Sequence, residues 1–334
     1  MIMHNPRLGY LIAIIAISLI VTFYQIQFAK LQDKIETLER NIVRHDQQKL
    51  VLNNNVNDND FVLIYNRVPK TGSTSFVGVT YDLCKVNKFH VLHVNITANS
   101  HILSLDNQFK FVKNVTNWKS IKPALYHGHF AFVDFSKFGV PKPLYINIIR
   151  KPLDRFISYY YFVRYGDNFR PYLIRRKHGN TVSFDECVSK SLPDCDPNNI
   201  WLQIPFFCGH SANCWKPGNK WALNEAKKNL VNNYLLVGVT EELNDFIDIL
   251  EHTLPTVFNG SLHHYLNSNK SHLRQTVQKE MPSEKTIVKL RQSMALQMEN
   301  EFYEFALDQF HFIKKQGKKR IQNLMYEKIK PKLI

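Results

Sequence analysis

A short apolar run that leads into a glycine-containing loop and then a helix constrains the fold more than any other feature of this sequence. Phe61–Tyr65 has the length and apolar character of a buried strand, and residues 75–86 read as a helical segment. Between them lies Pro-Lys-Thr-Gly-Ser-Thr, residues 69–74. A loop at such a junction presents backbone N–H groups and the positive end of a helix dipole, which suits a phosphate. The sequence therefore predicts an α/β fold with a phosphate-binding loop.

Further apolar runs alternate with helical segments along the chain. The strand candidates are His90–Val94, Leu144–Ile149 and Leu235–Val239. The helical candidates run from Leu153 towards Val163, from Glu241 to Glu251 and from Lys285 to about Lys314. Strands that alternate with helices predict a parallel β-sheet flanked by helices. We expect this domain to occupy residues 61–334.

The apolar segment Gly9–Phe28 is long enough to cross a bilayer. A cleaved signal peptide is the alternative, but its shorter apolar core and small-residue cleavage site fit poorly. We expect residues 1–8 to be a short cytoplasmic tail and residues 9–28 to be an uncleaved transmembrane signal anchor. Apolar residues recur at three- and four-residue steps from Phe28 to Ile42. Residues 29–60 are therefore a stem, either a solvated stalk helix or a short oligomerising coiled coil.

The chain is strongly basic, with 43 Lys and Arg against 28 Asp and Glu and a net charge of +15. This charge favours a polyanionic partner, which could be a nucleic acid, an acidic membrane surface or an acidic polysaccharide. Four of the five cysteines crowd between Cys187 and Cys214 without a Cys-x-x-Cys pair, which argues against zinc. Disulfides need an oxidising compartment, so a nuclear nucleic-acid-binding protein is disfavoured.

The four clustered cysteines allow three disulfide connectivities. The local pairing closes the smallest loops and is the one we expect: Cys187 with Cys195, and Cys208 with Cys214. Cys84 is left without an assigned role. Asn-x-Ser/Thr sequons follow the apolar segment at Asn95, Asn114, Asn259 and Asn269. We expect glycosylation at the first two, Asn95 and Asn114.

Two strand–helix junctions carry residues suited to phosphate. The first is not the nucleoside triphosphate loop Gly-x-x-x-x-Gly-Lys-[Ser/Thr], because Lys70 precedes Gly72, and a capped helix start without a ligand is the alternative interpretation. The second carries Arg150 at a strand end and Ser158 on the following helix. Arginine forms bidentate, charge-assisted bonds with phosphate, and a serine hydroxyl donates one more.

Residues 69–74 resemble the 5′-phosphosulfate loop of sulfotransferases, and Arg150 with Ser158 resembles their 3′-phosphate clamp. From about Phe61 to Ile313, the chain closely resembles the heparan sulfate 2-O-sulfotransferases, the uronyl 2-O branch of the Golgi sulfotransferases. The matching stretches are residues 67–71, 126–129, 158–162, 201–210 and 299–307. Gly72 and Lys151 depart from the pattern, which has alanine and often an acidic residue at these positions. The resemblance implies the sulfotransferase fold.

The resemblance also implies a reaction. A sulfuryl group would pass from 3′-phosphoadenosine 5′-phosphosulfate (PAPS) to the 2-hydroxyl of iduronic, less often glucuronic, acid in heparan sulfate. The implied donor-binding residues are Lys70, Thr71, Gly72, Ser73, Thr74, Ser75, Arg150 and Ser158. Lys70 would also neutralise the charge that develops on the leaving nucleotide. No cluster of carboxylates suggests a metal, and we expect none, because cationic side chains can take its place.

The sequence His127-Gly-His129 supplies candidates for the base that the acceptor hydroxyl requires. Residues two apart face the same side of an extended segment, and a histidine pKa near 6.5 suits a near-neutral lumen. A His-x-His pair more often belongs to a surface turn or a metal site, which is the alternative interpretation. The resemblance implies instead that His129 is the base and that His127 assists or holds it. We then expect the rate to rise through a single ionisation near neutrality.

A basic run follows the second junction and comprises Arg164, Arg170, Arg175, Arg176 and Lys177. A solvated run of charges is the alternative interpretation. The resemblance implies that the acceptor polysaccharide is bound by Arg67, Tyr81, His93, Arg170, Arg175, Arg176 and Arg274. Lys328, near the C-terminus, would also approach the ligand.

The resemblance places the protein in the Golgi membrane as a single-pass type II protein with a luminal catalytic domain. It implies a homotrimer that acts on heparan sulfate polysaccharide and not on nucleic acid. Two alternatives stay open, a dermatan or chondroitin uronyl 2-O-sulfotransferase and a heparan-binding membrane lectin that has lost catalysis. The presence of Lys70, Arg150, Ser158 and His129 counts against the lectin.

Overall fold

The computed structural model describes residues 18–30, 61–95, 100–268 and 275–329, the last fourteen of these (316–329) as backbone only. The chain divides into two units, Met1–Asn55 and Val56–Ile334. In the first unit, residues 18–30 are helical. No helix within the described ranges is long and apolar enough to cross a bilayer. Residues 9–17 of the expected anchor and residues 31–60 of the expected stem lie outside the described residues, so both stay predictions.

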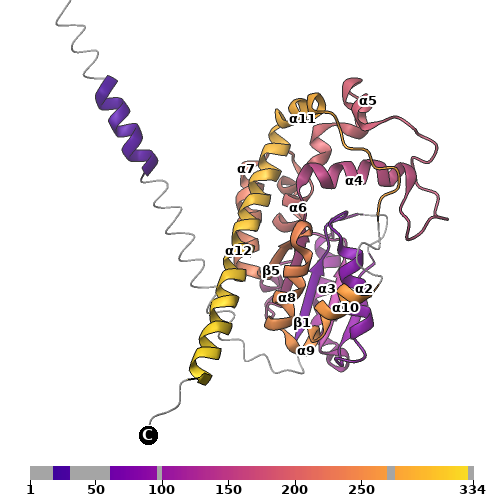
Figure 1. Cartoon of the computed structure of the whole chain (residues 1–334), viewed down its shortest axis with the longest axis vertical. Coiled ribbons are helices and arrows are strands. Elements are labelled where there is room, and N and C mark those ends of the chain that lie inside the picture. Colours follow the sequence, from indigo (N-terminus) through magenta and orange to yellow (C-terminus); the bar gives the residue numbers. More distant parts are fainter. Residues whose placement is uncertain (1–17, 31–60, 96–99, 269–274, 330–334) are drawn as a thin grey trace, which may run out of the picture. The chain divides into compact units, whose positions relative to one another are not determined.

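The second unit is built on a five-stranded sheet with the order β2-β3-β1-β4-β5, in which every neighbouring pair is parallel (Figure 1). Its strands are β1 (Val62–Asn66), β2 (His90–His93), β3 (Ala124–Gly128), β4 (Leu144–Ile149) and β5 (Tyr234–Val239). The predicted parallel α/β fold is confirmed, and so are the four strands expected from apolar runs. β3 was missed, because Ala-Leu-Tyr-His-Gly has neither a continuous aliphatic run nor a regular alternation. Its pairing with β1 and β2 makes it a strand.

Helices cover the sheet and extend beyond it (Figure 1). They are α2 (Ser73–Leu83), α3 (Leu105–Asn117), α4 (Pro152–Tyr165), α5 (Phe184–Ser189), α6 (Gln203–Cys208), α7 (Lys220–Asn233), α8 (Leu243–Thr253), α9 (Pro255–Phe258), α10 (Ser261–Asn267), α11 (Glu284–Arg291) and α12 (Met294–Ile329). The single helix predicted from Lys285 to about Lys314 is wrong. Two helices are separated at Gln292 and Ser293, and α12 continues to Ile329.

The buried faces explain why these elements pack. Leu63, Ile64 and Tyr65 of β1 are fully buried, as expected for a central strand covered on both faces. Phe76 of α2 packs its ring edge-on against Tyr65 and against Phe246 of α8, with ring centroids 5.4 and 5.3 Å apart. Buried aromatic pairs of this kind add to the stabilisation from removing apolar surface from water. The start of α2, which follows the phosphate-binding loop, is therefore anchored in the core.

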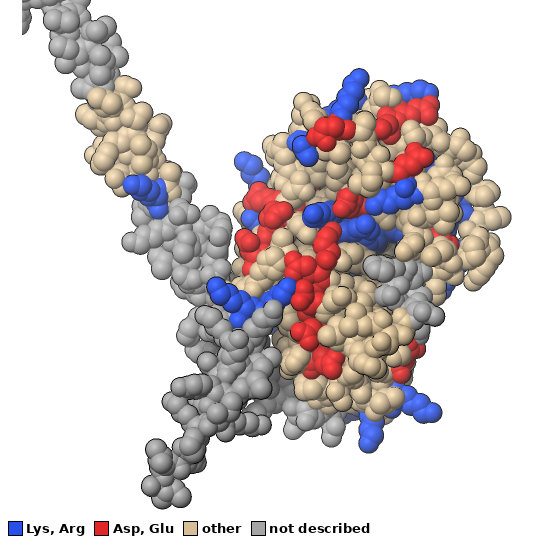
Figure 2. Space-filling model, viewed as in Figure 1, with Lys and Arg blue, Asp and Glu red and all other residues tan. Residues whose placement is uncertain are grey.

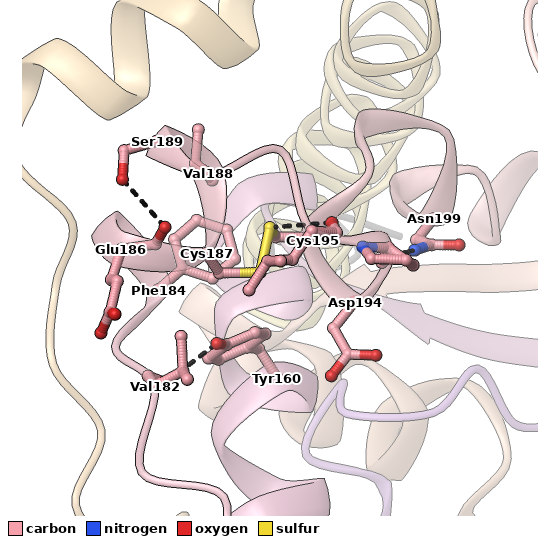
Figure 3. Close-up of a disulfide and its surroundings, with 12 residues drawn as sticks. Tyr160, Val182, Phe184, Glu186, Cys187, Val188, Ser189, Asp194, Cys195 and Asn199 are labelled. Carbon is pink, nitrogen blue, oxygen red and sulfur yellow. Dashed lines mark hydrogen bonds between the residues drawn. A yellow bond between two sulfur atoms is a disulfide. The ribbon is translucent and has the colours of Figure 1, made fainter.

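Both expected disulfides are confirmed, Cys187–Cys195 and Cys208–Cys214. Figure 3 shows the first beside Phe184 and Tyr160, and both cysteines belong to a buried apolar cluster. Each bond closes a short loop, which stabilises the fold by about 2–3 kcal/mol under the chain-entropy model. The Cys187–Cys195 bond fixes the segment that carries Asp194, which forms ion pairs with Arg164 and Lys177.

Candidate active site

The predicted site residues gather at the carboxyl edge of the sheet, although they come from distant parts of the chain. In open parallel α/β sheets, ligands bind at this edge, where neighbouring strands connect to opposite sides. Here β1 lies at this topological switch point, because β3 and β2 lie on one side of it and β4 and β5 on the other. The residues at or just after the strand ends are Arg67 (β1), His93 (β2), His127 and His129 (β3), Arg150 (β4) and Thr240 (β5).

The loop between β1 and α2 is held in an unusual backbone conformation. Lys70 and Gly72 have positive φ angles of 68° and 75°. The carbonyl oxygen of Thr71, between them, accepts a hydrogen bond from the hydroxyl of Thr240 at 2.9 Å, and the Thr71 hydroxyl donates to the Val68 carbonyl at 2.9 Å. A Cβ atom at Gly72 would lie 3.4 Å from the Thr240 methyl group, so glycine suits both the space and the φ angle. These contacts fix the loop before any ligand binds.

The start of α2 is suited to an anion. Gly72 is its N-cap residue, and no side chain in the described part of the chain caps this helix. The first N–H groups of a helix have no partner within the helix, so they are available to a phosphate. The alternative of a capped helix start therefore loses its support.

A cavity of about 1020 Å³ opens at this edge. Among the residues predicted for the donor and for catalysis, it is lined by Lys70, Gly72, Ser73, Thr74, Ser75, His129, Arg150 and Ser158. Thr71 does not line it, because its side chain is fully buried behind the loop. Two strand–helix junctions and His129, just after β3, thus share one cavity, whereas His127 is not among the residues that line it.

Arg150 and Ser158 occupy the β4–α4 side of the cavity. One guanidinium nitrogen of Arg150, Nη1, donates to the Lys70 carbonyl at 3.4 Å, so the two junctions are in contact. The Ser158 hydroxyl lies 3.2 Å from the hydroxyl of Thr276. Sequence reasoning missed Thr276 and Lys279, which also line the cavity. Burial, followed by the positive charge of Arg150, lowers the pKa of Lys279, as expected for a second cation facing a shared anion site.

His129 is held at both ring nitrogens by one residue, Arg67. Its Nδ1 lies 2.8 Å from the Arg67 carbonyl oxygen, and its Nε2 lies 3.2 Å from Nη2 of the Arg67 guanidinium. A guanidinium only donates and a carbonyl only accepts, so Nδ1 carries the proton and the lone pair of Nε2 accepts from the guanidinium. Burial, followed by the Arg67 charge, lowers the pKa of His129 to about 3. The histidine is therefore neutral near pH 7, and the expected ionisation near neutrality is not what this environment favours.

His127 belongs to a cluster with Tyr81 and His93. The Tyr81 hydroxyl lies 2.9 Å from Nε2 of His127, and the His93 ring stacks on the His127 ring at 5.0 Å between centroids. Burial, followed by the charge of Arg67, lowers the pKa of His127 to about 3 and also lowers that of His93. β3 ends at Gly128, so the expected extended geometry applies to His127, whereas His129 lies just beyond the strand.

The basic run divides into structural and exposed members. Arg164 is buried, donates to Asp194 at 2.7 Å and stacks on Tyr160, and Lys177 pairs with the same Asp194 at 3.2 Å. Arg164, which was not among the predicted acceptor-binding residues, therefore belongs to the core. Basic and acidic side chains are interspersed on the face drawn in Figure 2, so the net charge forms no uniform basic surface there.

The remaining arginines of the run, Arg170, Arg175 and Arg176, follow α4 in turns and irregular structure. Arg175 is mostly buried, lies 3.5 Å from Asp167 and packs over the Phe162 ring, which also contacts the Lys70 ammonium group at 4.2 Å. Arg176 is exposed and donates to the Tyr159 hydroxyl at 3.2 Å, and Arg170 is exposed as well. Arg274 and the side chain of Lys328 lie outside the described residues. The sequon residues Asn95 and Asn114 are both exposed.

The fold and the cavity together define a class, a nucleotide-binding transferase in which phosphate-binding groups face a neutral histidine. Residues 53–306 match the profile of the sulfotransferase family, and the chain belongs to this family. Its members take the sulfonate group from PAPS. No group of three potential metal ligands occurs among the described residues.

Named relatives extend this comparison over nearly the whole chain. The chain is 62% identical over 276 residues to the heparin sulfate O-sulfotransferase of Drosophila melanogaster, covering 81% of this chain and 79% of the relative. It is 51% identical over 350 aligned positions to heparan sulfate 2-O-sulfotransferase 1 of Homo sapiens and to that of Gallus gallus, covering 99% of this chain and 98% of each relative.

Proposed function

We propose that this protein transfers a sulfuryl group from PAPS to the 2-hydroxyl of iduronic, less often glucuronic, acid in heparan sulfate. The observation that carries the proposal is the single cavity that brings Lys70, Arg150, Ser158 and His129 together at the carboxyl edge of the sheet. The names of the relatives support the choice of heparan sulfate and of the 2-O position.

The donor side fits a nucleotide with phosphates at both ends of its ribose. The loop at the start of α2 offers the first backbone N–H groups of this helix, which no side chain of the described residues caps. Arg150 and Ser158 would hold the 3′-phosphate, and Thr276 and Lys279 line the same cavity. Lys70 would hold the oxygens on which negative charge builds as the nucleotide leaves. Because these cations can neutralise that charge, we expect no metal.

On the acceptor side, His129 would act as the base. The donor supplies an activated sulfuryl group. The acceptor oxygen forms a bond to sulfur while the bond from sulfur to the phosphate oxygen breaks, and the hydroxyl proton goes to Nε2 of His129. Nε2 is bonded to Arg67 in this structure, so the guanidinium must move first. An acceptor carboxylate or sulfate is a stronger partner for arginine than a neutral imidazole, so acceptor binding itself would free the base.

The other predicted acceptor residues keep their roles within this proposal. Tyr81 and His93 would contact the uronate, and their contacts with His127 suggest how that histidine assists. Arg170, Arg175 and Arg176, together with Arg274, would bind sulfate and carboxylate groups. Guanidinium groups match these anions bidentately, which allows them to read a sulfation pattern as well as total charge.

We propose the same cellular setting that the sequence favours. The apolar segment of residues 9–28 would anchor a type II protein in the Golgi membrane, with the catalytic domain in the lumen and the chain assembled as a homotrimer. Two disulfides support an oxidising compartment. The exposure of Asn95 and Asn114 supports their use as glycosylation sites.

The proposal is tested with the full-length protein, isotopically labelled PAPS and N-sulfated heparan precursor. The expected result is label on the 2-position of the uronic acid after depolymerisation into disaccharides, and none with Lys70→Ala. Polysaccharide binding without any transfer by the wild-type protein would support a lectin instead. Label on the glucosamine would reject the 2-O assignment.

A further inference from the structure

Two of the stretches that carry the family resemblance, residues 201–210 and 299–307, have no part in the chemistry described so far. The structure places one residue of each beside the turn between β4 and α4, where Arg150 lies. These residues are Gln203 at the start of α6 and Glu299 on α12, and both side chains are fully buried. Burying polar groups is costly unless they are hydrogen-bonded, so their partners show what they hold in place.

Gln203 binds the backbone of Arg150 on both sides. Its Oε1 accepts a hydrogen bond from the Arg150 N–H at 2.9 Å, and its Nε2 donates to the Arg150 carbonyl at 2.9 Å. The side-chain amide thus pairs with Arg150 as a neighbouring strand would, one residue beyond the end of β4. With both backbone groups fixed, the direction in which the Arg150 side chain leaves the turn is fixed as well.

Glu299 in turn determines how the Gln203 amide is oriented. Its Oε2 accepts from Nε2 of Gln203 at 3.3 Å, and its Oε1 accepts from the backbone N–H groups of Leu202 and Ile204 at 2.9 and 3.0 Å. A carboxylate only accepts, so the amide must turn its NH₂ group towards Glu299 and its oxygen towards the Arg150 N–H. Burial raises the pKa of Glu299, and the positive charge of the buried Arg155 and the hydrogen bonds from Ile204, Leu202 and Gln203 oppose that rise by favouring the carboxylate.

A second contact with α12 supports the same turn. Glu241 accepts from the N–H of Lys151 at 3.0 Å with one carboxylate oxygen and from the Tyr303 hydroxyl at 3.1 Å with the other. Tyr303 follows Glu299 by four residues, so both lie on one side of the helix. Successive backbone N–H groups of the turn are therefore held by two side chains, each of which is bonded to α12.

We propose that Gln203 and Glu299 are positioning residues of the donor site, which hold the Arg150 turn so that its guanidinium group faces the 3′-phosphate. α12 supports this arrangement through Glu299 and, more weakly, through Tyr303. The inference rests on the proposed function, because it takes the Arg150 ligand to be the 3′-phosphate of the donor. The inference assigns a role to residues 201–210 and 299–307, which take no part in the proposed chemistry.

The test compares two nucleotides that differ at the 3′-position. Calorimetry on the full-length protein would measure the affinity for 3′-phosphoadenosine 5′-phosphate and for adenosine 5′-phosphate. Gln203→Leu should raise the Kd of the first about tenfold, the scale of one charged contact, and leave the second within about twofold. Arg150→Ala should do the same, and combining the two changes should add little, because they disable one contact. A change that only lowered stability would affect both nucleotides alike.

Further variants keep the test decisive. Glu299→Gln should reduce the preference for the 3′-phosphate, and Tyr303→Phe should reduce it by about twofold. These two decide the question if Gln203→Leu does not fold. Glu301→Gln is the matched control, since Glu301 lies on α12 in an exposed ion pair with Lys227. An unchanged preference for the 3′-phosphate in folded Gln203→Leu or Glu299→Gln would overturn this inference and leave the proposed function standing. A wild-type protein without the preference would reject the proposed donor site, and the inference with it.

Discussion

The donor side and the acceptor side of the cavity are built in different ways. On the donor side, Thr71 and Arg150 follow strands within a few residues, and partly buried hydrogen bonds with Thr240 and Gln203 fix their backbone. On the acceptor side, Arg170, Arg175 and Arg176 lie within residues 168–183, where the chain forms turns and irregular structure only. The donor groups are therefore held ready by the fold, whereas the acceptor groups depend on local ion pairs and exposed side chains.

This difference shows that neighbouring charges in a sequence need not share a role. Arg164 and Arg176 are twelve positions apart in one basic run, yet the first is buried against Asp194 and the second is exposed beside Tyr159. The partner of Arg164 is thirty residues away in the chain. A charge run indicates the sign of a surface, but the packing decides which of its members can reach a ligand.

The largest effect on kcat is expected for His129, which lies where the donor side and the acceptor side meet. His129→Ala should lower kcat by about a thousandfold, because general base catalysis is typically worth 10²–10⁴-fold. Donor affinity, measured by calorimetry, should stay unchanged. His252→Ala is a matched control, since His252 lies exposed on α8 and outside the cavity. A loss below tenfold would move the base elsewhere, first to His127.

The same residue predicts the pH dependence. Burial and Arg67 lower the pKa of His129 to about 3, so the free enzyme should hold a neutral base across the whole neutral range. The pH profile of kcat/KM should be flat from pH 8 down to about 5 and fall only below that. Arg67→Met should move the acid limb towards neutrality, because it removes the guanidinium charge. A wild-type limb centred near pH 6.5 would contradict this environment for His129.

The free energy of unfolding should also depend on the protonation of His129 and His127. The unfolded chain takes up protons on His129 and His127 near pH 6.5, and the folded chain does so only near the pKa of about 3. The unfolded state thus binds more protons between these values, so stability falls as pH drops through this window. His129→Asn should show a smaller loss between pH 7 and pH 4 in thermal unfolding. An identical loss in both proteins would place the acid sensitivity elsewhere.

On the donor side, Lys70→Ala should lower kcat by about 10²–10³-fold, the usual cost of removing one group that stabilises developing charge. The melting temperature should change little, because the side chain lies at the cavity. Lys85→Ala, an exposed lysine beyond the end of α2, serves as the control. Near-normal turnover in Lys70→Ala would remove the assigned role of the loop.

The acceptor side should respond more weakly and in two distinct ways. Arg176→Ala should lower kcat/KM for the polysaccharide several-fold, the scale of one exposed charge, and the effect should shrink as salt is raised. Arg164→Ala should instead lower the melting temperature, because it leaves Asp194 without its buried partner. Unfolding and kinetic measurements on the same preparations separate the two outcomes. Similar behaviour of both variants would contradict the division of the basic run.

The smallest effect on catalysis is expected from the Cys187–Cys195 bond. Replacing both cysteines with serine should lower the melting temperature by roughly 5–10 °C, given about 2–3 kcal/mol in a domain of this size. Because the bond fixes the segment with Asp194, the KM for polysaccharide should rise while donor affinity stays constant. An equal loss of donor affinity would show that the two sides are not separable in this way.

The sequence predicted the two strand–helix junctions of the donor side, since Phe61–Tyr65 and Leu144–Ile149 are apolar runs that become buried strands, each followed by a motif with clear chemistry. It was insufficient for β3, which becomes a strand only through its neighbours. Thr276 and Lys279 come from an irregular segment without a motif, and only the fold brings them to Ser158 and Arg150. The low pKa of His129 also depends on burial and on Arg67, which no local pattern reports.

The most direct test of the central claim is a competition between two acceptors. The full-length protein would be given limiting PAPS with equal amounts of N-sulfated heparan precursor and dermatan, and the sulfated disaccharides of each would be counted. We predict 2-O-sulfated iduronate almost entirely in the heparan chains, because guanidinium groups such as those of Arg175 and Arg176 suit their pattern of N-sulfates. Equal sulfation of dermatan would contradict the heparan assignment and favour the dermatan alternative.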